Sequence, residues 1–183
     1  MSRRVQLVLL CEDKQHEAFA RRFLNAMGWE TRAMRVEKAS GGRGAGEQFV
    51  RERFPLELKA HRSRPVSQAL VVMVDGDRDG IGARLYQLGQ ACRDAGVAER
   101  TEEERVAIII PSWNIETWLA YLEGEQVGED RPNYPRLVRE RDCQTHVEVL
   151  VRMCRAGELR EPAPPSLEAA CGEYYARLAA ETR

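Results

Sequence analysis

The chain has 183 residues, of which 43% are apolar and 31% charged, which is an ordinary composition for a folded domain with a sizeable core. Because 28 Lys and Arg residues face 29 Asp and Glu, the net charge of −1 excludes a general attraction to nucleic acids or membranes. Five scattered cysteines fit neither a disulfide framework nor a zinc knuckle, so we expect buried or incidental thiols.

The first part of the chain alternates between predicted strands and helices. In order, we expect a strand at 5–11, a helix ending before Gly28, a strand at 31–36, a glycine-rich loop at 40–46, a helix at 47–61, a strand at 69–74, a helix at 81–95 and a strand at 106–110. Apolar strands without two-residue alternation are typical of a sheet with helices on both faces. The pattern therefore predicts an α/β fold with an open, mostly parallel, four-stranded sheet in a domain at 1–122.

The remaining residues, 123–183, are predicted to form a helical C-terminal extension packed on the same domain. We expect a loop at 124–135 and helices at 143–156 and 167–180, separated by prolines. Ser166 is a candidate N-cap for the last helix. The first apolar stretch, at 5–11, is too short for a signal peptide or a membrane span, so the cytoplasm is the expected location.

Acidic residues follow the predicted strands at the points where the strands end. Glu12 follows the first strand, Asp75, Asp77 and Asp79 follow the third, and Glu116 lies in a helix after the fourth. Ligands of open α/β sheets bind at the carboxyl ends of the strands, so these acids are expected along one edge. Closely spaced carboxylates repel one another unless a hard cation lies between them. The sequence therefore predicts a site for a divalent cation.

These residues resemble a known family. The strand ending in Glu12, the strand ending in Asp75-Gly-Asp77 and the segment Pro-Ser-Trp-Asn-Ile-Glu-Thr-Trp-Leu-Ala at 111–120 look like the TOPRIM fold of topoisomerases, DnaG-type primases and overcoming-lysogenization-defect nucleases. The last segment is also similar to small bacterial TOPRIM-like proteins of uncharacterised function. The resemblance covers residues 5–122 and depends on the order and spacing of the three pieces.

The resemblance implies a phosphoryl-transfer site that uses Mg²⁺ or Mn²⁺. Glu12 matches the general acid/base or metal ligand, Asp75 and Asp77 match the metal-binding pair, and Glu116 and Asp79 are candidate supporting groups. The sequence departs from the family at two positions. Asp13 replaces a glycine, either as a helix cap, which we favour, or as an extra charge that widens the metal site. His16 replaces an aspartate and is expected either as a phosphate contact or, as we favour, as a surface side chain.

Basic residues predict where nucleic acid would bind. Residues 32–64 contain nine Lys or Arg against four Glu, which fits either a phosphate-binding surface or a solvated helix and loop. The candidate contacts are Lys38, Arg43, Arg51, Arg53 and Arg78. Trp118 has helical spacing with Ile115 and Leu122 and is expected in the core instead of against a base.

The favoured hypothesis is a small Mg²⁺-dependent nuclease that acts in bacterial defence or nucleic-acid processing, with an ATPase as a candidate partner. The alternative is a non-catalytic TOPRIM-like module that binds nucleic acid or a partner protein. An EF-hand loop is disfavoured because position twelve is Tyr86, and a haloacid-dehalogenase-like phosphatase because Asp75 follows the third strand instead of the first. A polar turn without chemistry is the remaining interpretation of the acids.

Overall fold

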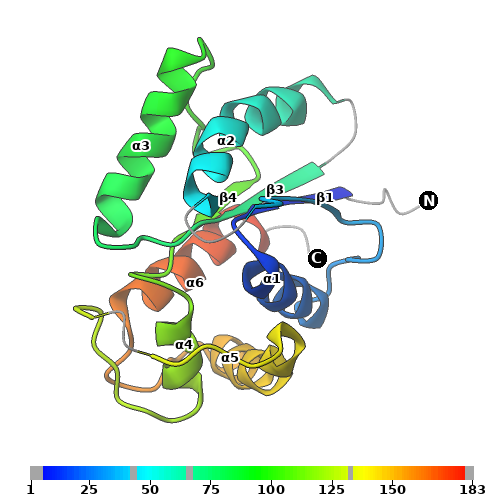
Figure 1. Cartoon of the computed structure of the whole chain (residues 1–183). Coiled ribbons are helices and arrows are strands. Elements are labelled where there is room, and N and C mark those ends of the chain that lie inside the picture. Colours follow the sequence, from blue (N-terminus) through cyan, green and yellow to red (C-terminus); the bar gives the residue numbers. More distant parts are fainter. Residues whose placement is uncertain (1–5, 42–44, 65–67, 132–133, 180–183) are drawn as a thin grey trace.

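The computed structural model describes residues 6–41, 45–64, 68–131 and 134–179, and its centre is a four-stranded parallel sheet (Figure 1). The strands lie in the order β2-β1-β3-β4, and every neighbouring pair is parallel. Their bounds are Gln6–Cys11 for β1, Arg35–Lys38 for β2, Gln68–Met73 for β3 and Val106–Ile109 for β4. The predicted α/β class and open parallel sheet are confirmed.

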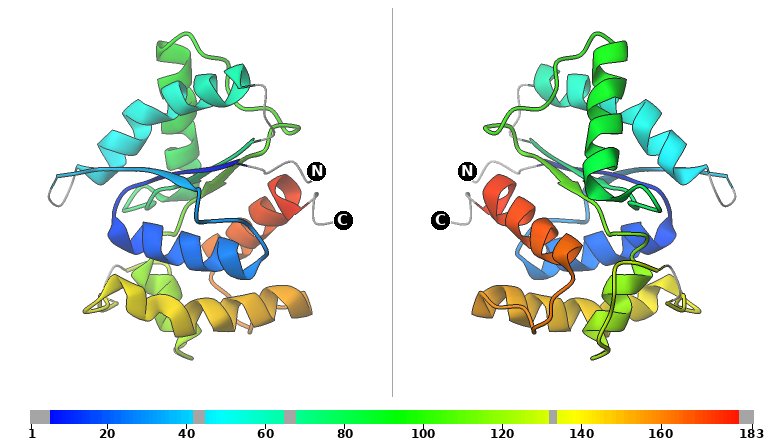
Figure 2. Two further views of the ribbon diagram at one scale, coloured as in Figure 1. Left: turned by 90° about the vertical axis from the view of Figure 1, so that its right-hand side faces the viewer. Right: turned by 90° about the vertical axis from the view of Figure 1, so that its left-hand side faces the viewer.

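Helices cover both faces of this sheet (Figure 2). Helices α2 and α3 lie on one face, and α1 and α6 lie on the other, where α4 and α5 form an outer layer. The helix bounds are Lys14–Ala26 for α1, Gly46–Ser63 for α2, Gly80–Asp94 for α3, Glu116–Leu122 for α4, Gln144–Ala156 for α5 and Pro165–Arg177 for α6, with a short 3₁₀ helix, η1, at Glu140–Cys143.

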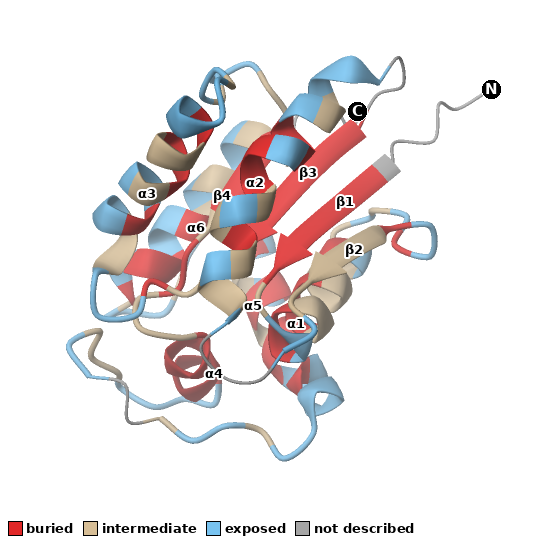
Figure 3. Cartoon of the chain, turned by 45° about the horizontal axis from the view of Figure 1, so that its top comes forward, coloured by how far each residue is buried: buried red, intermediate tan, exposed pale blue. Residues whose placement is uncertain are grey.

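The strands are apolar on both sides because each face of the sheet is buried. Along β1, Leu7 and Leu9 point into the core under α1, α4, α5 and α6, whereas Val8 and Leu10 point into the core under α2 and α3. Figure 3 shows β1 and β3 buried and β2, at the edge, only partly covered. The helices of the C-terminal extension therefore share a core with the sheet, and Trp118, 1% exposed, lies in it as predicted.

The order of the strands places a topological switch point between β1 and β3. From β1 the chain crosses through α1 on one face of the sheet to β2, and from β3 it crosses through α3 on the other face to β4. The two connections leave β1 and β3 toward opposite faces, which opens a crevice outside the carboxyl ends of these strands. Glu12 and Asp75 follow those two ends.

Two of the predicted element positions are wrong. The second strand is Arg35–Lys38 and not 31–36, because the N–H of Met34 bonds back to the carbonyl of Thr31 in a turn. Ser166 is not the N-cap of α6: Pro164 takes that position and Pro165 begins the helix, where the missing N–H of proline costs nothing. The Ser166 hydroxyl instead bonds the indole of Trp118 and the carboxylate of Glu129.

The other predicted helices and strands agree with the structure to within a few residues at their ends. Of the predicted loop at 40–46, Gly46 begins α2 and residues 42–44 lie outside the described residues. The predicted first residue of β1, Val5, and the predicted last residue of the final helix, Ala180, lie outside the described residues. No helix in the described ranges is long and apolar enough to cross a membrane.

Candidate functional site

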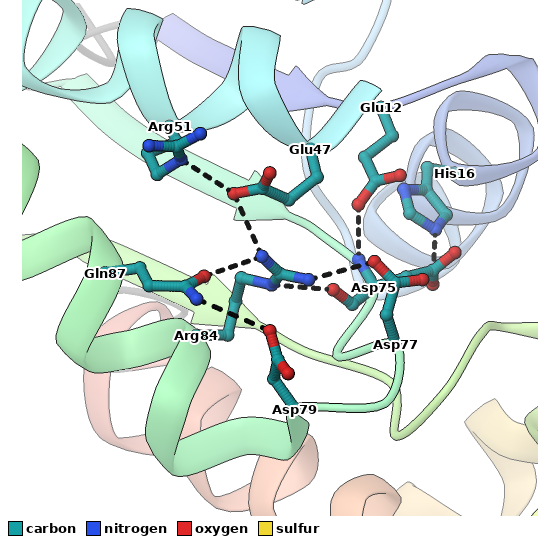
Figure 4. Close-up of polar contacts among 9 residues, drawn as sticks. All are labelled: Glu12, His16, Glu47, Arg51, Asp75, Asp77, Asp79, Arg84 and Gln87. Atoms are coloured by element: carbon teal, nitrogen blue, oxygen red, sulfur yellow. Dashed lines mark hydrogen bonds and ion pairs between the residues drawn. The ribbon is translucent and has the colours of Figure 1, made fainter. Parts of the chain in front are cut away.

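Glu12 and Asp75 are in direct contact at the switch point. Carboxylate oxygen Oε1 of Glu12 accepts a hydrogen bond from the backbone N–H of Asp75 at 2.7 Å. The first residue of α2, Gly46, packs so closely on Glu12 that a Cβ there would lie 2.7 Å from the Glu12 Cβ. Glu12 is therefore held between the end of β3 and the start of α2, as Figure 4 shows.

His16 is fully buried, so its predicted surface position is wrong. Its Nε2 lies 2.9 Å from Oδ1 of Asp75, and its Nδ1 is buried without a hydrogen-bond partner among the described residues. Burial alone would lower the pKa of His16, but the charges of Asp75, Asp13 and Glu12 outweigh it and raise the pKa to about 10. His16 is thus an imidazolium that neutralises Asp75 from the α1 side.

Asp13 places His16 by capping α1. The Asp13 side chain accepts from the backbone N–H of His16 at 2.9 Å and so takes up one of the unpaired donors at the start of the helix. The cap interpretation of Asp13 is therefore confirmed. Since the cap fixes the first turn of α1, it also fixes the direction from which His16 approaches Asp75.

The residues after Asp75 form a tight turn that brings Asp77 back toward the sheet edge. The N–H of Gly76 bonds the carbonyl of Pro111 at 2.8 Å, and a Cβ on Gly76 would lie 3.1 Å from the same oxygen. Asp77 has a left-handed backbone, with φ of 46°, and its N–H bonds the carbonyl of Trp113 at 2.9 Å. The turn is therefore joined to the segment that follows β4.

Arg84, on α3, is the centre of the hydrogen bonds around this turn (Figure 4). Its side chain is buried, and it donates from Nε to the carbonyl of Asp75 at 3.0 Å and from Nη2 to Oδ2 of Asp77 at 2.9 Å. Its Nη1 lies 2.7 Å from Gln87 Oε1 and 2.9 Å from Glu47 Oε1. Three of the five N–H groups of the guanidinium therefore donate hydrogen bonds within the protein, and with the ion pair to Glu47 Arg84 connects the turn to both α2 and α3.

Burial and mutual repulsion raise the pKa values of the predicted acids. The pKa of Glu12 is raised to about 7, first by burial and then by the charge of Asp75. Burial and Asp75 also raise the pKa of Asp77, although Arg84 acts against this. For Glu116 the main cause of its raised pKa is burial, and the charge of Asp75 adds to it. For all three side chains burial is the main cause of the raised pKa, and the charge of Asp75 adds to it.

Glu116 and Asp79 line two different depressions of the surface. Glu116 lines a polar cleft with Glu12 and Lys38, and its carboxylate lies 3.4 Å from the guanidinium of Arg136. Asp79 is exposed and turns toward α3, where its Oδ2 lies 3.5 Å from the side-chain amide of Gln87. The structure therefore brings Glu116 to the acidic edge but directs Asp79 away from Glu12.

Most of the predicted nucleic-acid contacts are engaged in ion pairs. Lys38 lies 2.5 Å from Glu17, Arg51 lies 3.0 Å from Glu47, and Arg53 lies 3.0 Å from Glu57. Arg78 is exposed on the turn and lines a shallow depression with Asp77 and Asp79. Arg43 lies outside the described residues.

The carboxylates fit a divalent cation only in part. Glu12 Oε2, Asp75 Oδ2 and Asp77 Oδ1 have no hydrogen-bond partner in the described part of the chain, so each residue keeps one oxygen for a ligand. However, no three His, Cys, Asp or Glu side chains within the described ranges are arranged to hold a metal ion together. His16 and Arg84 supply the positive charge at Asp75 and Asp77 instead.

No protein-family model matches the chain, and searches of curated proteins and of solved structures gave no significant match.

Proposed function

We propose that this chain is a Mg²⁺- or Mn²⁺-dependent phosphoryl-transfer protein of the TOPRIM type, acting as a nuclease on DNA or RNA. The observation that supports this most is the contact between Glu12 and Asp75 at the switch point of the sheet, with the pKa of Glu12 raised to about 7. The candidate ligands are the free oxygens of Glu12, Asp75 and Asp77. A bound ion would neutralise phosphate oxygens and supply a nucleophilic water.

Each side chain of the site has a separate role in this proposal. Glu12 has a pKa near neutrality, so it can hold or accept a proton in the pH range where such enzymes act. His16 and Arg84 hold Asp75 and Asp77 in place. Glu116, in the cleft beside Glu12, is close enough to affect a ligand there. Arg78, exposed beside Asp77, is the candidate phosphate contact with the fewest competing partners among the candidates that the structure describes.

The test is a cleavage assay on supercoiled plasmid, single-stranded DNA and RNA, with Mn²⁺, Mg²⁺ or a chelator present. We expect cleavage that depends on the metal and is lost in Glu12→Gln and Asp77→Asn. Asp79→Asn is the matched control, because Asp79 carries the same charge in the same turn but is directed toward Gln87. If Asp79→Asn lost as much cleavage as Asp77→Asn, the loss would reflect only the removal of a negative charge from the turn.

The second candidate is a non-catalytic module of the same fold that binds nucleic acid or a partner protein such as an ATPase. Two observations favour it: Asp75 and Asp77 already have cationic partners, and three of the predicted phosphate contacts are in ion pairs. In this case the parent protein binds no divalent cation at millimolar concentration and cleaves none of the substrates.

A further inference from the structure

A pair of cysteines lies away from the acidic edge, between the two long helices of the C-terminal extension. Cys154 is in the last turn of α5 and Cys171 is near the middle of α6. Their sulfur atoms are 3.7 Å apart, which is contact distance for two thiols. The other cysteines of the chain, Cys11, Cys92 and Cys143, are buried and free.

The helices hold these sulfurs close enough to be joined by a small movement. A disulfide bond is about 2.05 Å long, so the sulfurs must approach each other by roughly 1.7 Å. An apolar cavity of about 60 Å³, lined by Cys171 and by Leu150 of α5, leaves room for a side-chain rotation. The hydroxyl of Tyr175 bonds the carbonyl of Cys154 at 2.8 Å, so the two helix turns are already joined.

The two thiols differ in ways that suit oxidation. The hydrogen bond with Cys171 lowers the pKa of the Cys154 thiol, while the same bond and burial raise the pKa of the Cys171 thiol. Either sulfur can donate in this contact, and the thiol that accepts the shared hydrogen bond is the one that ionises more readily. Cys171 is partly exposed and Cys154 is buried, so the pair is open to solvent on the Cys171 side.

We propose that Cys154 and Cys171 are a reversible oxidation site, at which a peroxide converts the two thiols into an intramolecular disulfide between α5 and α6. The Cys154 thiolate attacks one oxygen of hydrogen peroxide, which forms a sulfenic acid and releases the other oxygen as water after protonation. The Cys171 sulfur then attacks the sulfenic sulfur, forms the S–S bond and releases a second water. Two electrons pass from the thiols to the peroxide, and a dithiol reductant returns them.

The disulfide would close a loop between residues 17 positions apart. A cross-link of this loop length restricts the unfolded chain, so we expect oxidation to raise the thermal midpoint by roughly 5–10 °C. This inference is independent of the proposed metal site, because neither cysteine contacts an acidic-edge residue that the structure describes.

The test treats the folded full-length chain with hydrogen peroxide and follows it by intact mass, thiol titration and peptide mapping. We expect the mass to fall by two hydrogens and two of the five thiols to disappear. Peptide mapping should give a single cross-linked pair that contains Cys154 and Cys171. Dithiothreitol should reverse the change. The rise in thermal midpoint should vanish in Cys154→Ser and in Cys171→Ser but persist in Cys143→Ser, which removes a buried thiol of η1.

Three results would overturn the inference. One is a parent protein that keeps all five thiols under peroxide while it remains folded. Another is oxidation of Cys171 alone to a sulfinic acid or to a disulfide between two chains. The third is an intramolecular disulfide that leaves the thermal midpoint unchanged. The mass and mapping data on the parent decide the first two without any variant, so poor folding of a serine variant does not affect them.

Discussion

Replacing Arg84 should destabilise the chain far more than replacing Arg78, although both arginines lie close to Asp77. We consider Arg84→Met and Arg78→Met, each of which removes one positive charge and keeps a long apolar side chain. Arg84 is 4% exposed and connects the 75–77 turn to α2 and α3, whereas Arg78 is exposed. The comparison therefore separates the hydrogen bonds of the guanidinium from its charge.

The expected magnitude follows from the partners that Arg84 would leave behind. Breaking a buried ion pair by removing one partner costs about 3–5 kcal/mol. The Asp77 side chain is 59% exposed and that of Glu47 is 21% exposed, so water solvates both in part after the change. We therefore expect a loss of about 2–4 kcal/mol for Arg84→Met and less than about 0.5 kcal/mol for Arg78→Met.

The assay is urea unfolding of both variants and the parent, followed by circular dichroism and analysed by linear extrapolation. A shift in the midpoint at an unchanged slope reports stability alone. If Arg84→Met unfolds within about 0.5 kcal/mol of Arg78→Met, the hydrogen bonds of Arg84 do not stabilise the turn, and the described role of Arg84 is refuted.

Three further predictions concern the acidic edge. Between pH 4.5 and about 7 the folded state holds a proton on Glu12 that the unfolded chain releases. The free energy of unfolding should therefore fall as pH rises through this range. Urea titrations across the range should show a smaller fall for Glu12→Gln. His16→Gln should lower stability most below pH 6.5, where the charged pair with Asp75 contributes fully. The difference in stability from the parent should disappear as pH passes about 10. A difference that does not change with pH would contradict the ion pair. Gly46→Ala should destabilise by about 1–3 kcal/mol because its Cβ meets Glu12, whereas Gly82→Ala, with open space around it in α3, should be neutral or stabilising by thermal unfolding.

The sheet could be predicted where both of its faces are buried. β1, β3 and β4 are short apolar runs, and such runs are typical of strands between two layers of helices. β2 could not be located well because it is an edge strand that is only half-buried, and its residues Arg35 and Glu37 are held by ion pairs. Pairing with β1 decides that Arg35–Lys38 is a strand, and a local pattern does not contain this information.

The acids of the site could be predicted because they follow strands, but their partners could not. His16 and Arg84 are charged side chains on the buried faces of α1 and α3, and only the tertiary contacts with Asp75 and Asp77 make their burial favourable. A signal for Arg84 was present: it shares a helical stripe with Leu88 and Cys92, which are both buried.

The predicted basic surface is less open than its composition indicates, because the glutamates of the same segment are spaced to pair with its arginines. Arg51 pairs with Glu47 and Arg53 with Glu57, each four residues away on α2. A count of charges over residues 32–64 does not show this pairing. The position of each charge on the helix decides which cations remain available to a phosphate.

The most direct test of the proposed function is Mn²⁺ and Mg²⁺ binding by titration calorimetry, with the parent, Asp77→Asn and the control Asp79→Asn. We predict that the parent and Asp79→Asn bind a cation with similar affinity and that Asp77→Asn binds about 10-fold more weakly or not at all. Binding should also release protons at pH 7, because the pKa of Glu12 is about 7 without the ion. A folded parent that binds neither cation would contradict the metal site and favour the non-catalytic module.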